Sequence, residues 1–360
     1  MTRILFVVDA PYDFGALLQL NVLIRGLDPS RNEIHLAIMT ELAPSGLFAE
    51  NSERHLVPPN STASQKFVWL RSLIKHLQPE IVHAWNNSSH TQVKNATSFT
   101  KNCRRVFTFL EQPESRGFFR SWSDKFQVRG SDAFIVSHQT LADGLREQGL
   151  QELTVVNNTI SDHDSDRAAA RARLLELVGL EPGSTGSVYL AGATPSFRPR
   201  FRVKDIVWAM DLLCCIRKDI HLLIFGDGDD AGIRRFISFT EAGDNVHLVP
   251  RDLWRECDLD GLDVFWNSHL QTPNPTSLLT AMANEVPVIG VLGPETSDLM
   301  KPLATGLAVN FGARDELSRW TKFLIEQPDS RAQLVAQARN YAEQNFPTKA
   351  AVSAYEILYG

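Results

Sequence analysis

Four basic residues lie close together in the segment RPRFRVK, where Arg198, Arg200, Arg202 and Lys204 fall within seven residues. An apolar stretch precedes the segment and an amphipathic one follows it, which predicts a loop between a strand and a helix. Guanidinium and ammonium groups in such a loop can hold a diphosphate and neutralise the charge that develops as it leaves. A solvated charged loop without a ligand fits the composition equally well, and both interpretations stay open.

The stretch from Gln271 to Gly290, QTPNPTSLLTAMANEVPVIG, predicts a second anion site. Pro273 and Pro275 prevent an early helix, after which Thr276 or Ser277 can cap one. The apolar VPVIG then fits a buried strand. The free N–H groups at the start of such a helix, together with its dipole, favour a phosphate. Turns of this kind are common in α/β proteins, so the pattern predicts an anion without identifying it.

A glycine-rich segment, GDGDDAG from Gly226 to Gly232, follows an apolar strand and opens a helix. Its spacing is that of a loose dinucleotide motif. However, Pro250 and Arg251 stand where an acidic residue should end the next strand. We therefore favour a turn near some other phosphate, or plain turn chemistry, over nicotinamide binding.

Acid–base and metal chemistry have weaker candidates. Asp258, Asp260 and Asp263 cluster in a turn and at a strand start, and we interpret them as structural. His83 ends an apolar strand where it could face a cleft, although a histidine in that place is more often simply hydrogen-bonded. We find no metal-ligand spacing, nucleophile elbow or P-loop. The expectation is that neither a metal nor another cofactor is needed.

The segment RGFFRSWSDKF, residues 116–126, interleaves aromatic and basic side chains. An apolar stripe edged with bases can lie on an anionic membrane surface. A helix with one face in the core and one in water has the same pattern. Peripheral contact with the inner face of a membrane is thus the second interpretation of this segment.

Length and composition limit the class of protein. The chain has 360 residues, longer than a single core usually grows, which predicts two domains. A net charge of −6 argues against general nucleic-acid binding. The four cysteines have no disulfide-like or ligand-like spacing, which indicates a reducing compartment. The apolar run at the start of the sequence is too short for a signal peptide, and no apolar run approaches the length of a membrane span. We expect a cytoplasmic protein.

Short apolar strands alternate with amphipathic helices along the chain, which predicts parallel, doubly wound sheets. The expected strands of the first part are 3–8, 33–39, 80–84, 104–109, 132–137 and 153–157. The charged segment 162–173 indicates a linker and a helix that join two domains. The alternation then restarts with strands at 187–193, 220–228, 245–250, 262–267, 286–290 and 306–311, and the tail from 329 to 359 is nearly all helix.

The pattern predicts an α/β protein with two Rossmann-like domains whose parallel sheets face an interdomain cleft. We expect an N-terminal, acceptor-side domain at 1–165 and a C-terminal, nucleotide-sugar-side domain at 166–345. A C-terminal helix at 346–360 is expected to pack back on the N-terminal domain.

Taken in order, these segments resemble the retaining, nucleotide-sugar-dependent glycosyltransferases of the GT-B fold in family four, also called glycosyltransferase group 1. The resemblance covers most of the chain and rests on an ordered set of motifs, none of which is specific alone. They are EIVHAWN (80–86), VSHQTLADGL (136–145), VVNNTISD (155–162), RARLLELVGL (171–180), HLLIFGDGD (221–229), LDVFWN (262–267) and LLTAMANEVPVIG (278–290).

The resemblance implies a donor site. Gly192 and Lys204 match the glycine and lysine of the family's phosphate loop, while Ala193 replaces its arginine and Arg198, Arg200 or Arg202 substitutes for it. Gly15 matches a glycine near the diphosphate. Backbone N–H groups from Thr276 through Ser277 to Leu278 would cap the diphosphate, and Arg251 would lie near the base.

The sequence departs from the family at the catalytic positions. The family carries two glutamates eight residues apart, the first near the donor sugar and the second on the ribose, and Thr272 and Thr280 stand there instead. The family's sugar-contacting histidine falls near Glu111. A threonine can form a hydrogen bond but has no charge to offer a developing oxocarbenium ion.

The expected function is metal-independent transfer of a hexosyl group, with retention, from a nucleotide sugar to an unknown acceptor, which could be a glycan, a lipid-linked sugar or a small molecule. Lys204, Thr272 and Glu111 are the candidate catalytic residues. The alternative is a degenerate, non-catalytic relative that binds a partner through the same cleft or through the basic and aromatic segment 116–126. A nicotinamide-dependent oxidoreductase, resting on the Gly226 turn, is a third interpretation.

Overall fold

The structure is a computed structural model. It describes residues 1–9, 14–40, 51–98, 100, 103–110, 132–161, 166–181, 188–197, 201–226, 228–250, 253–267, 276–293, 296–297 and 299–360. The chain divides into two compact units. The first contains Met1–Pro11, Ala16–Thr159 and Thr348–Gly360, and the second contains Ile160–Pro347. Each is considered by itself.

The first unit is built on a seven-stranded sheet in the order β3-β2-β1-β4-β5-β6-β7, and every pair of neighbours is parallel. Its strands are β1 (Thr2–Val8), β2 (Asn32–Ile38), β3 (Glu53–Leu56), β4 (Ile81–Ala84), β5 (Arg104–Phe109), β6 (Ala133–Val136) and β7 (Thr154–Val155). Most of these segments are buried on both faces and apolar, as parallel strands covered by helices should be.

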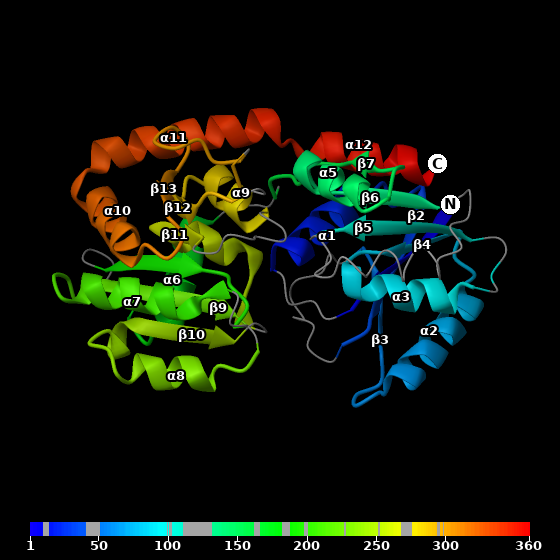
Figure 1. Cartoon of the computed structure of the whole chain (residues 1–360), viewed down its shortest axis with the longest axis horizontal. Coiled ribbons are helices and arrows are strands. Elements are labelled where there is room, and N and C mark those ends of the chain that lie inside the picture. Colours follow the sequence, from blue (N-terminus) through cyan, green and yellow to red (C-terminus); the bar gives the residue numbers. More distant parts are fainter. Residues whose placement is uncertain are drawn as a thin grey trace. The chain divides into compact units, whose positions relative to one another are not determined.

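Helices cover both faces of this sheet (Figure 1). Those of the first unit are α1 (Phe14–Gly26), α2 (Ala63–Leu77), α3 (Asn87–Ala96), α5 (Gln139–Glu147) and α12 (Thr348–Tyr359). The apolar sides of α2, α3 and α5 share one core cluster with side chains from one face of the sheet. On the opposite face, α12 lies against α1, where the Val352 side chain occupies the space that a Cβ on Gly26 would need.

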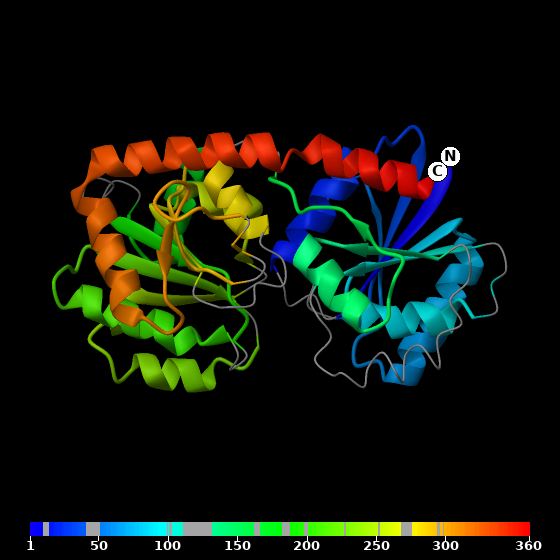
Figure 2. The ribbon, with the colours of Figure 1, turned by 45° about the horizontal axis from the view of Figure 1, so that its top comes forward.

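The second unit repeats the plan with a six-stranded parallel sheet in the order β10-β9-β8-β11-β12-β13. Its strands are β8 (Tyr189–Ala193), β9 (Ile220–Gly226), β10 (Val246–Pro250), β11 (Val264–Asn267), β12 (Val288–Val291) and β13 (Leu307–Val309). Its helices are α6 (Arg167–Leu177), α7 (Val203–Cys214), α8 (Ala231–Ile237), α9 (Thr276–Ala283), α10 (Arg314–Glu326) and α11 (Pro328–Asn345), with 3₁₀ turns η3 (Gly243–Asn245) and η5 (Glu256–Gly261). As in the first unit, the strands form the middle layer (Figure 2).

The predicted α/β class and the two Rossmann-like sheets are confirmed, with one strand missed. Segment 53–56, ERHL, forms β3 at the edge of the first sheet although it is mostly exposed and charged. An edge strand needs no apolar run because only one side of it is paired, and charges there discourage pairing with another chain. The helical tail is also interrupted, since α11 ends at Asn345 and α12 begins at Thr348, with Pro347 between them.

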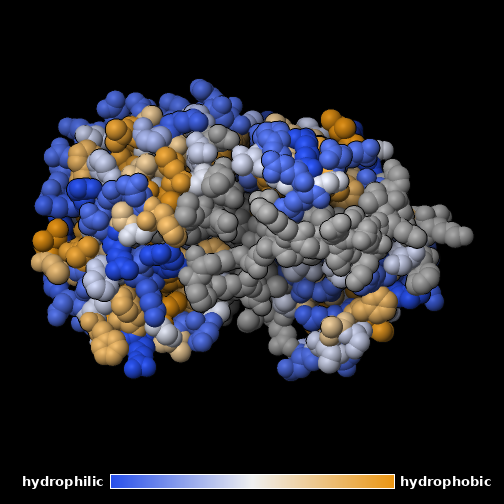
Figure 3. All heavy atoms as spheres, viewed as in Figure 1, coloured by the Kyte–Doolittle hydropathy of each residue, from blue (hydrophilic) through white to orange (hydrophobic). Residues whose placement is uncertain are grey.

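The described surface mixes polar and apolar residues. On the face drawn in Figure 3, hydrophilic and hydrophobic residues are interspersed over both units. None of the helices in the described ranges combines the length and the apolar character that crossing a membrane requires.

Candidate functional site

The strand order of the second unit marks a point where a ligand can bind. Strands β8 and β11 are adjacent and parallel, although β9 and β10, which come between them in the sequence, lie on the other side of β8. The side on which successive strands are added to the sheet therefore changes between β8 and β11. In doubly wound sheets, ligands bind beyond the carboxyl ends of the strands at such a switch point. Strand β8 leads into α7, which carries Lys204, and β11 leads into α9, which begins at Thr276. The two predicted anion-binding helices therefore start on either side of the same switch point.

Lys204 is the second residue of α7, and its side chain is exposed. Its ammonium nitrogen lies 5.6 Å from the centroid of the Phe236 ring on α8. A cation over an aromatic face is held only weakly when water has access to it. Lys204 is thus a cation at a helix start whose present contact costs little to give up.

Arg202, by contrast, is held by its neighbours. It is the N-cap of α7, with a left-handed φ of 50°, and its guanidinium donates to the Asp205 carboxylate. The same guanidinium lies 4.8 Å from the Phe311 ring centroid. The hydrogen bond to Asp205 raises the pKa of Arg202. Asp205 is buried and also accepts a 2.8 Å hydrogen bond from Arg314.

This network changes the expectation for the basic loop. Asp205 lies three residues after Arg202 and neutralises part of its charge, and the contact with Phe311 brings Arg202 close to the start of α10. Asp205, Phe311 and Arg314 were not among the predicted site residues. The spacing of Arg202 and Asp205 is a signal that the sequence does contain.

The start of α9 buries hydroxyl groups that have no hydrogen-bond partner among the described residues. Thr276, Ser277, Leu278 and Thr280 are all buried, at 0%, 5%, 1% and 0% exposure. The hydroxyl oxygens of Ser277 and Thr280 make no hydrogen bond within the described part of the chain. Burying a hydroxyl without a partner is unfavourable, so such groups need an explanation. Polar ligand atoms next to the start of α9 would supply one.

Two glycines that sequence reasoning linked to phosphate binding have packing roles. Gly192 lies inside β8, and a Cβ there would overlap the Leu262 side chain. Gly226 ends β9, where a Cβ would overlap the Phe197 ring and approach the Pro195 carbonyl oxygen. The loop that leaves β8 therefore crosses closely over the end of β9. Gly15, the third predicted glycine, is a buried residue in the first turn of α1.

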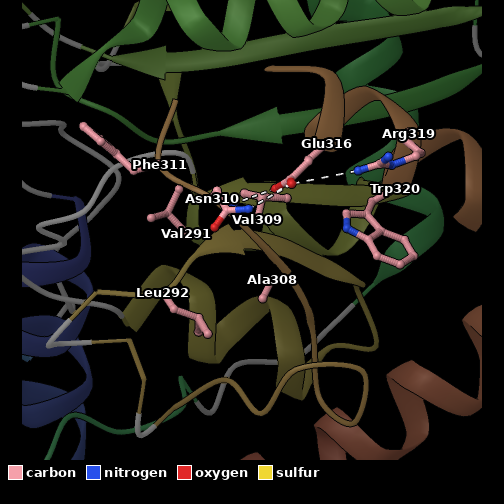
Figure 4. Close-up of a pocket in the computed structure, with 9 residues that line it drawn as sticks. All are labelled: Val291, Leu292, Ala308, Val309, Asn310, Phe311, Glu316, Arg319 and Trp320. Carbon is pink, nitrogen blue, oxygen red and sulfur yellow. Dashed lines mark hydrogen bonds and ion pairs between the residues drawn. The ribbon is translucent and has the colours of Figure 1, made fainter. Parts of the chain in front are cut away.

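A pocket of about 310 Å³ opens at the carboxyl ends of β12 and β13 (Figure 4). Its apolar lining comes from Val291, Leu292, Ala308, Val309, Phe311 and Trp320. Glu316 and Asn310 point toward one another, and the carboxylate accepts from the Asn310 backbone and side-chain amides at 2.6 and 2.9 Å. The polar groups of Glu316 and Asn310 in the pocket thus bind each other, and none of the predicted site residues lines the pocket.

The interpretation of the aspartate cluster as structural agrees with the contacts. Asp258 is buried, accepts from the Arg255 backbone N–H at 2.7 Å and pairs with Arg173. Asp263 pairs with Arg171 at 2.8 Å. Asp260 accepts from the Asn284 side chain at 2.7 Å. Each carboxylate is therefore used to join α6, η5 and their surroundings.

His83 is also structural. Its Nδ1 lies 2.8 Å from the Tyr359 hydroxyl and its Nε2 2.7 Å from Thr108 Oγ1. Burial lowers its pKa to about 3. It is a neutral, fully hydrogen-bonded residue between α12 and the first sheet.

Several predicted site residues fall outside the described ranges. They are the candidate catalytic residues Thr272 and Glu111, the bases Arg198, Arg200 and Arg251, and the whole of segment 116–126.

The two parallel sheets, each with the strand order of a Rossmann fold, are those of the GT-B fold that the solved structures below share. Residues 190–341 match the family described as "Glycosyl transferases group 1". This span includes Gly192, Lys204 and all of α9. None of the curated protein sequences matches the chain significantly.

Solved structures share the fold at low sequence identity. HepE of Anabaena, in complex with UDP and glucose, has a TM-score of 0.77 and 15% identity over 99% of each chain. TarM of S. aureus, in complex with fondaparinux, α-GlcNAc-glycerol and UDP, has a TM-score of 0.75 and 9% identity over 100% of both chains. Sucrose-phosphate synthase of Thermosynechococcus elongatus has a TM-score of 0.73 and 15% identity over 100% of this chain and 98% of that one.

Proposed function

We propose that the chain is a glycosyltransferase that moves a hexosyl group from a nucleotide sugar to an acceptor with retention of configuration. The observation that carries the proposal is the match of residues 190–341 to the glycosyl transferases group 1 family. It is supported by the position of Lys204 and α9 on either side of the switch point of the second sheet.

The donor diphosphate would lie at the start of α9. We expect the backbone N–H groups from Thr276 to Leu278 to face it, because the N–H groups of a first helical turn point out of the helix and the helix dipole favours an anion there. The buried hydroxyls of Ser277 and Thr280 are additional groups that can hydrogen-bond the nucleotide. Thr280 would hydrogen-bond the ribose, which is the role that the family resemblance implies for its position.

Lys204 would supply the positive charge. As the bond between the sugar and the diphosphate breaks, negative charge grows on the departing phosphate oxygen, and a cation placed there lowers the barrier. The Lys204 side chain can leave the Phe236 ring for this task because the lysine is exposed and the contact is weak. We also propose that side chains and helix N–H groups, rather than a metal ion, stabilise this negative charge. Arg198, Arg200, Arg251, Thr272 and Glu111 keep their proposed roles.

A uridine nucleotide sugar is the first donor to test, because the Anabaena protein with the same fold was solved with UDP-glucose. Uridine, adenosine and guanosine diphosphate sugars should be screened by thermal shift, followed by assays of hydrolysis and of transfer to glycan, lipid-linked and small-molecule acceptors. Stabilisation together with turnover supports the proposal. Stabilisation without turnover would identify a non-catalytic relative that binds the nucleotide. No stabilisation by any donor, or stabilisation by a nicotinamide dinucleotide, would overturn the assignment.

A further inference from the structure

Three side chains that can bind a metal come together on the edge strand β3 of the first sheet and on its neighbour β2, and none of them belongs to the donor site proposed above. Strands β2 and β3 are parallel, with His35 opposite Glu53 and Ala37 opposite His55. Alternate residues of a strand share a face, so Glu53 and His55 lie on the same face as His35. The register of one edge pair therefore brings two imidazoles and a carboxylate together.

The three groups are close enough to share one ion. His35 Nδ1 is 3.1 Å from His55 Nε2 and 3.4 Å from Glu53 Oε2. His55 Nε2 is 3.8 Å from Glu53 Oε1. A tetrahedral site with bonds of 2.0–2.1 Å spaces its ligand atoms by roughly 3.3 Å. The side chains of His35, His55 and Glu53 are 3%, 17% and 67% exposed, so the cluster is anchored in the sheet and open to solvent on one side.

The hydrogen bonds around His35 direct a lone pair into the cluster. Its Nε2 lies 3.0 Å from Glu33 Oε1. A carboxylate only accepts hydrogen bonds, so in the neutral imidazole the proton sits on Nε2 and Nδ1 is bare. Nδ1 then faces the carboxylate of Glu53, which offers lone pairs as well. Without an ion, a proton on His55 Nε2 can be donated to the His35 Nδ1 lone pair, and a cation bound between the three groups takes the place of that proton.

We propose that His35, Glu53 and His55 form a zinc site, with Glu33 orienting His35 from behind. Imidazole and carboxylate ligands suit Zn²⁺, and three protein ligands leave the fourth position to water. A carboxylate on the other nitrogen of a metal-binding histidine is the usual supporting contact. Arg3 in turn holds Glu33, through an ion pair of 2.8 Å. The ion joins β3 to β2 and stabilises the edge of the sheet, since a ligand that binds the folded state alone raises its stability.

A second histidine pair in the same chain provides an internal control. His221 on β9 and His247 on β10 are also on neighbouring parallel strands, and their Nδ1 and Nε2 atoms are 3.1 Å apart. Their ring centroids are 5.3 Å apart, as are those of His35 and His55. Here the nearby Asp219 is bonded to Arg217, and Asn245, just before β10, donates its amide to backbone carbonyls. Among the described residues, three potential ligands meet only at His35, Glu53 and His55.

The test uses the full chain without a polyhistidine tag, stripped of metal, in a Cys215→Ser background because that thiol is exposed. Zn²⁺ binding is measured by calorimetry, the site geometry by the visible absorption of bound Co²⁺, and stability by melting with Zn²⁺ or with chelator. We expect one ion per chain, a tetrahedral Co²⁺ spectrum and a higher melting temperature with zinc. Glu53→Gln and His55→Gln should each weaken Zn²⁺ binding at least tenfold, and Glu33→Gln about tenfold.

His247→Gln should bind Zn²⁺ as the parent does. Glu53 is mostly exposed, so the Glu53→Gln variant should fold. Its Zn²⁺ affinity tests the proposal even if the His55→Gln variant fails to fold. Unchanged affinity in Glu53→Gln, or equal losses in the His55 and His247 variants, would overturn the proposal.

Discussion

His83 and Tyr359 are 276 residues apart in the sequence, and the His83 Nδ1 and the Tyr359 hydroxyl lie 2.8 Å apart. The other His83 nitrogen is bonded to Thr108 on the adjacent strand β5. The His83 ring also lies 5.9 Å from that of Tyr355, one turn earlier on α12. The last helix of the chain is therefore tied to the centre of the first sheet through a buried, uncharged histidine.

This contact predicts a pH dependence. The pKa of His83 is about 3 in the folded chain because of burial, against roughly 6.5 when unfolded. Its contribution to stability is fully present above pH 6.5 and is lost as pH falls toward 3, because only the unfolded chain takes up the proton. Replacing it by His83→Gln should reduce the loss of unfolding free energy between pH 7 and pH 5 by about 2 kcal/mol.

Urea unfolding at the two pH values measures that difference. His76→Gln, at an exposed position on α2, is the matched control and should keep the wild-type dependence. An undiminished pH dependence in the His83 variant would show that this residue is not responsible.

Lys204→Ala tests the source of charge for the diphosphate. If Lys204 holds that group, the variant should bind a nucleoside diphosphate about tenfold more weakly or worse, a loss of roughly 1.4 kcal/mol. Its melting temperature should change little, because the exposed contact with Phe236 is worth only about 0.5–1 kcal/mol. Calorimetry with Lys322→Ala, an exposed lysine on α10, is the control. Equal affinity in the Lys204 variant and the wild type would exclude the role.

Thr280→Val removes a buried hydroxyl that has no partner in the described part of the chain. The variant should be more stable by about 1–3 kcal/mol, since an unsatisfied polar group disappears at nearly constant shape. If the hydroxyl serves a bound nucleotide, affinity should fall by about two- to tenfold at the same time. Opposite changes in melting temperature and affinity are the expected signature.

Thr321→Val is its control, because the Thr321 hydroxyl bonds to the Trp266 indole and to the Leu317 carbonyl. That variant should lose stability. A Thr280 variant that loses stability in the same way would contradict the assignment.

Gly192→Ala separates packing from ligand contact. The new methyl group would enter the space of the Leu262 side chain, at a cost of about 1–3 kcal/mol. Adding Leu262→Ala should recover part of that cost, so that the two losses are not additive. Denaturant unfolding of both single variants and the double variant gives the coupling energy. Strict additivity would mean that the glycine is needed for another reason.

The alternating pattern of the sequence was enough to predict most strands and the class of fold, because parallel strands covered on both faces must be continuously apolar. The same reasoning located α9 from Pro273 and Pro275, although Thr276 and Ser277, which were expected to cap the helix, are its first two residues. It failed for β3, which contains Glu53 and Arg54 and no apolar run, since pairing of an edge strand depends on its neighbour β2 and not on its own hydrophobicity.

By itself, the sequence thus determined two α/β sheets, the loops that follow their strands and the residue types that those loops present. The tertiary structure decided which of these residues act together. It placed Lys204 and α9 across one switch point, engaged Arg202 with Asp205, assigned Gly192 to packing, and brought His35, Glu53 and His55 within reach of one ion. These relations depend on strand order and register, which bring distant segments together and leave no periodic signal in any single stretch of chain.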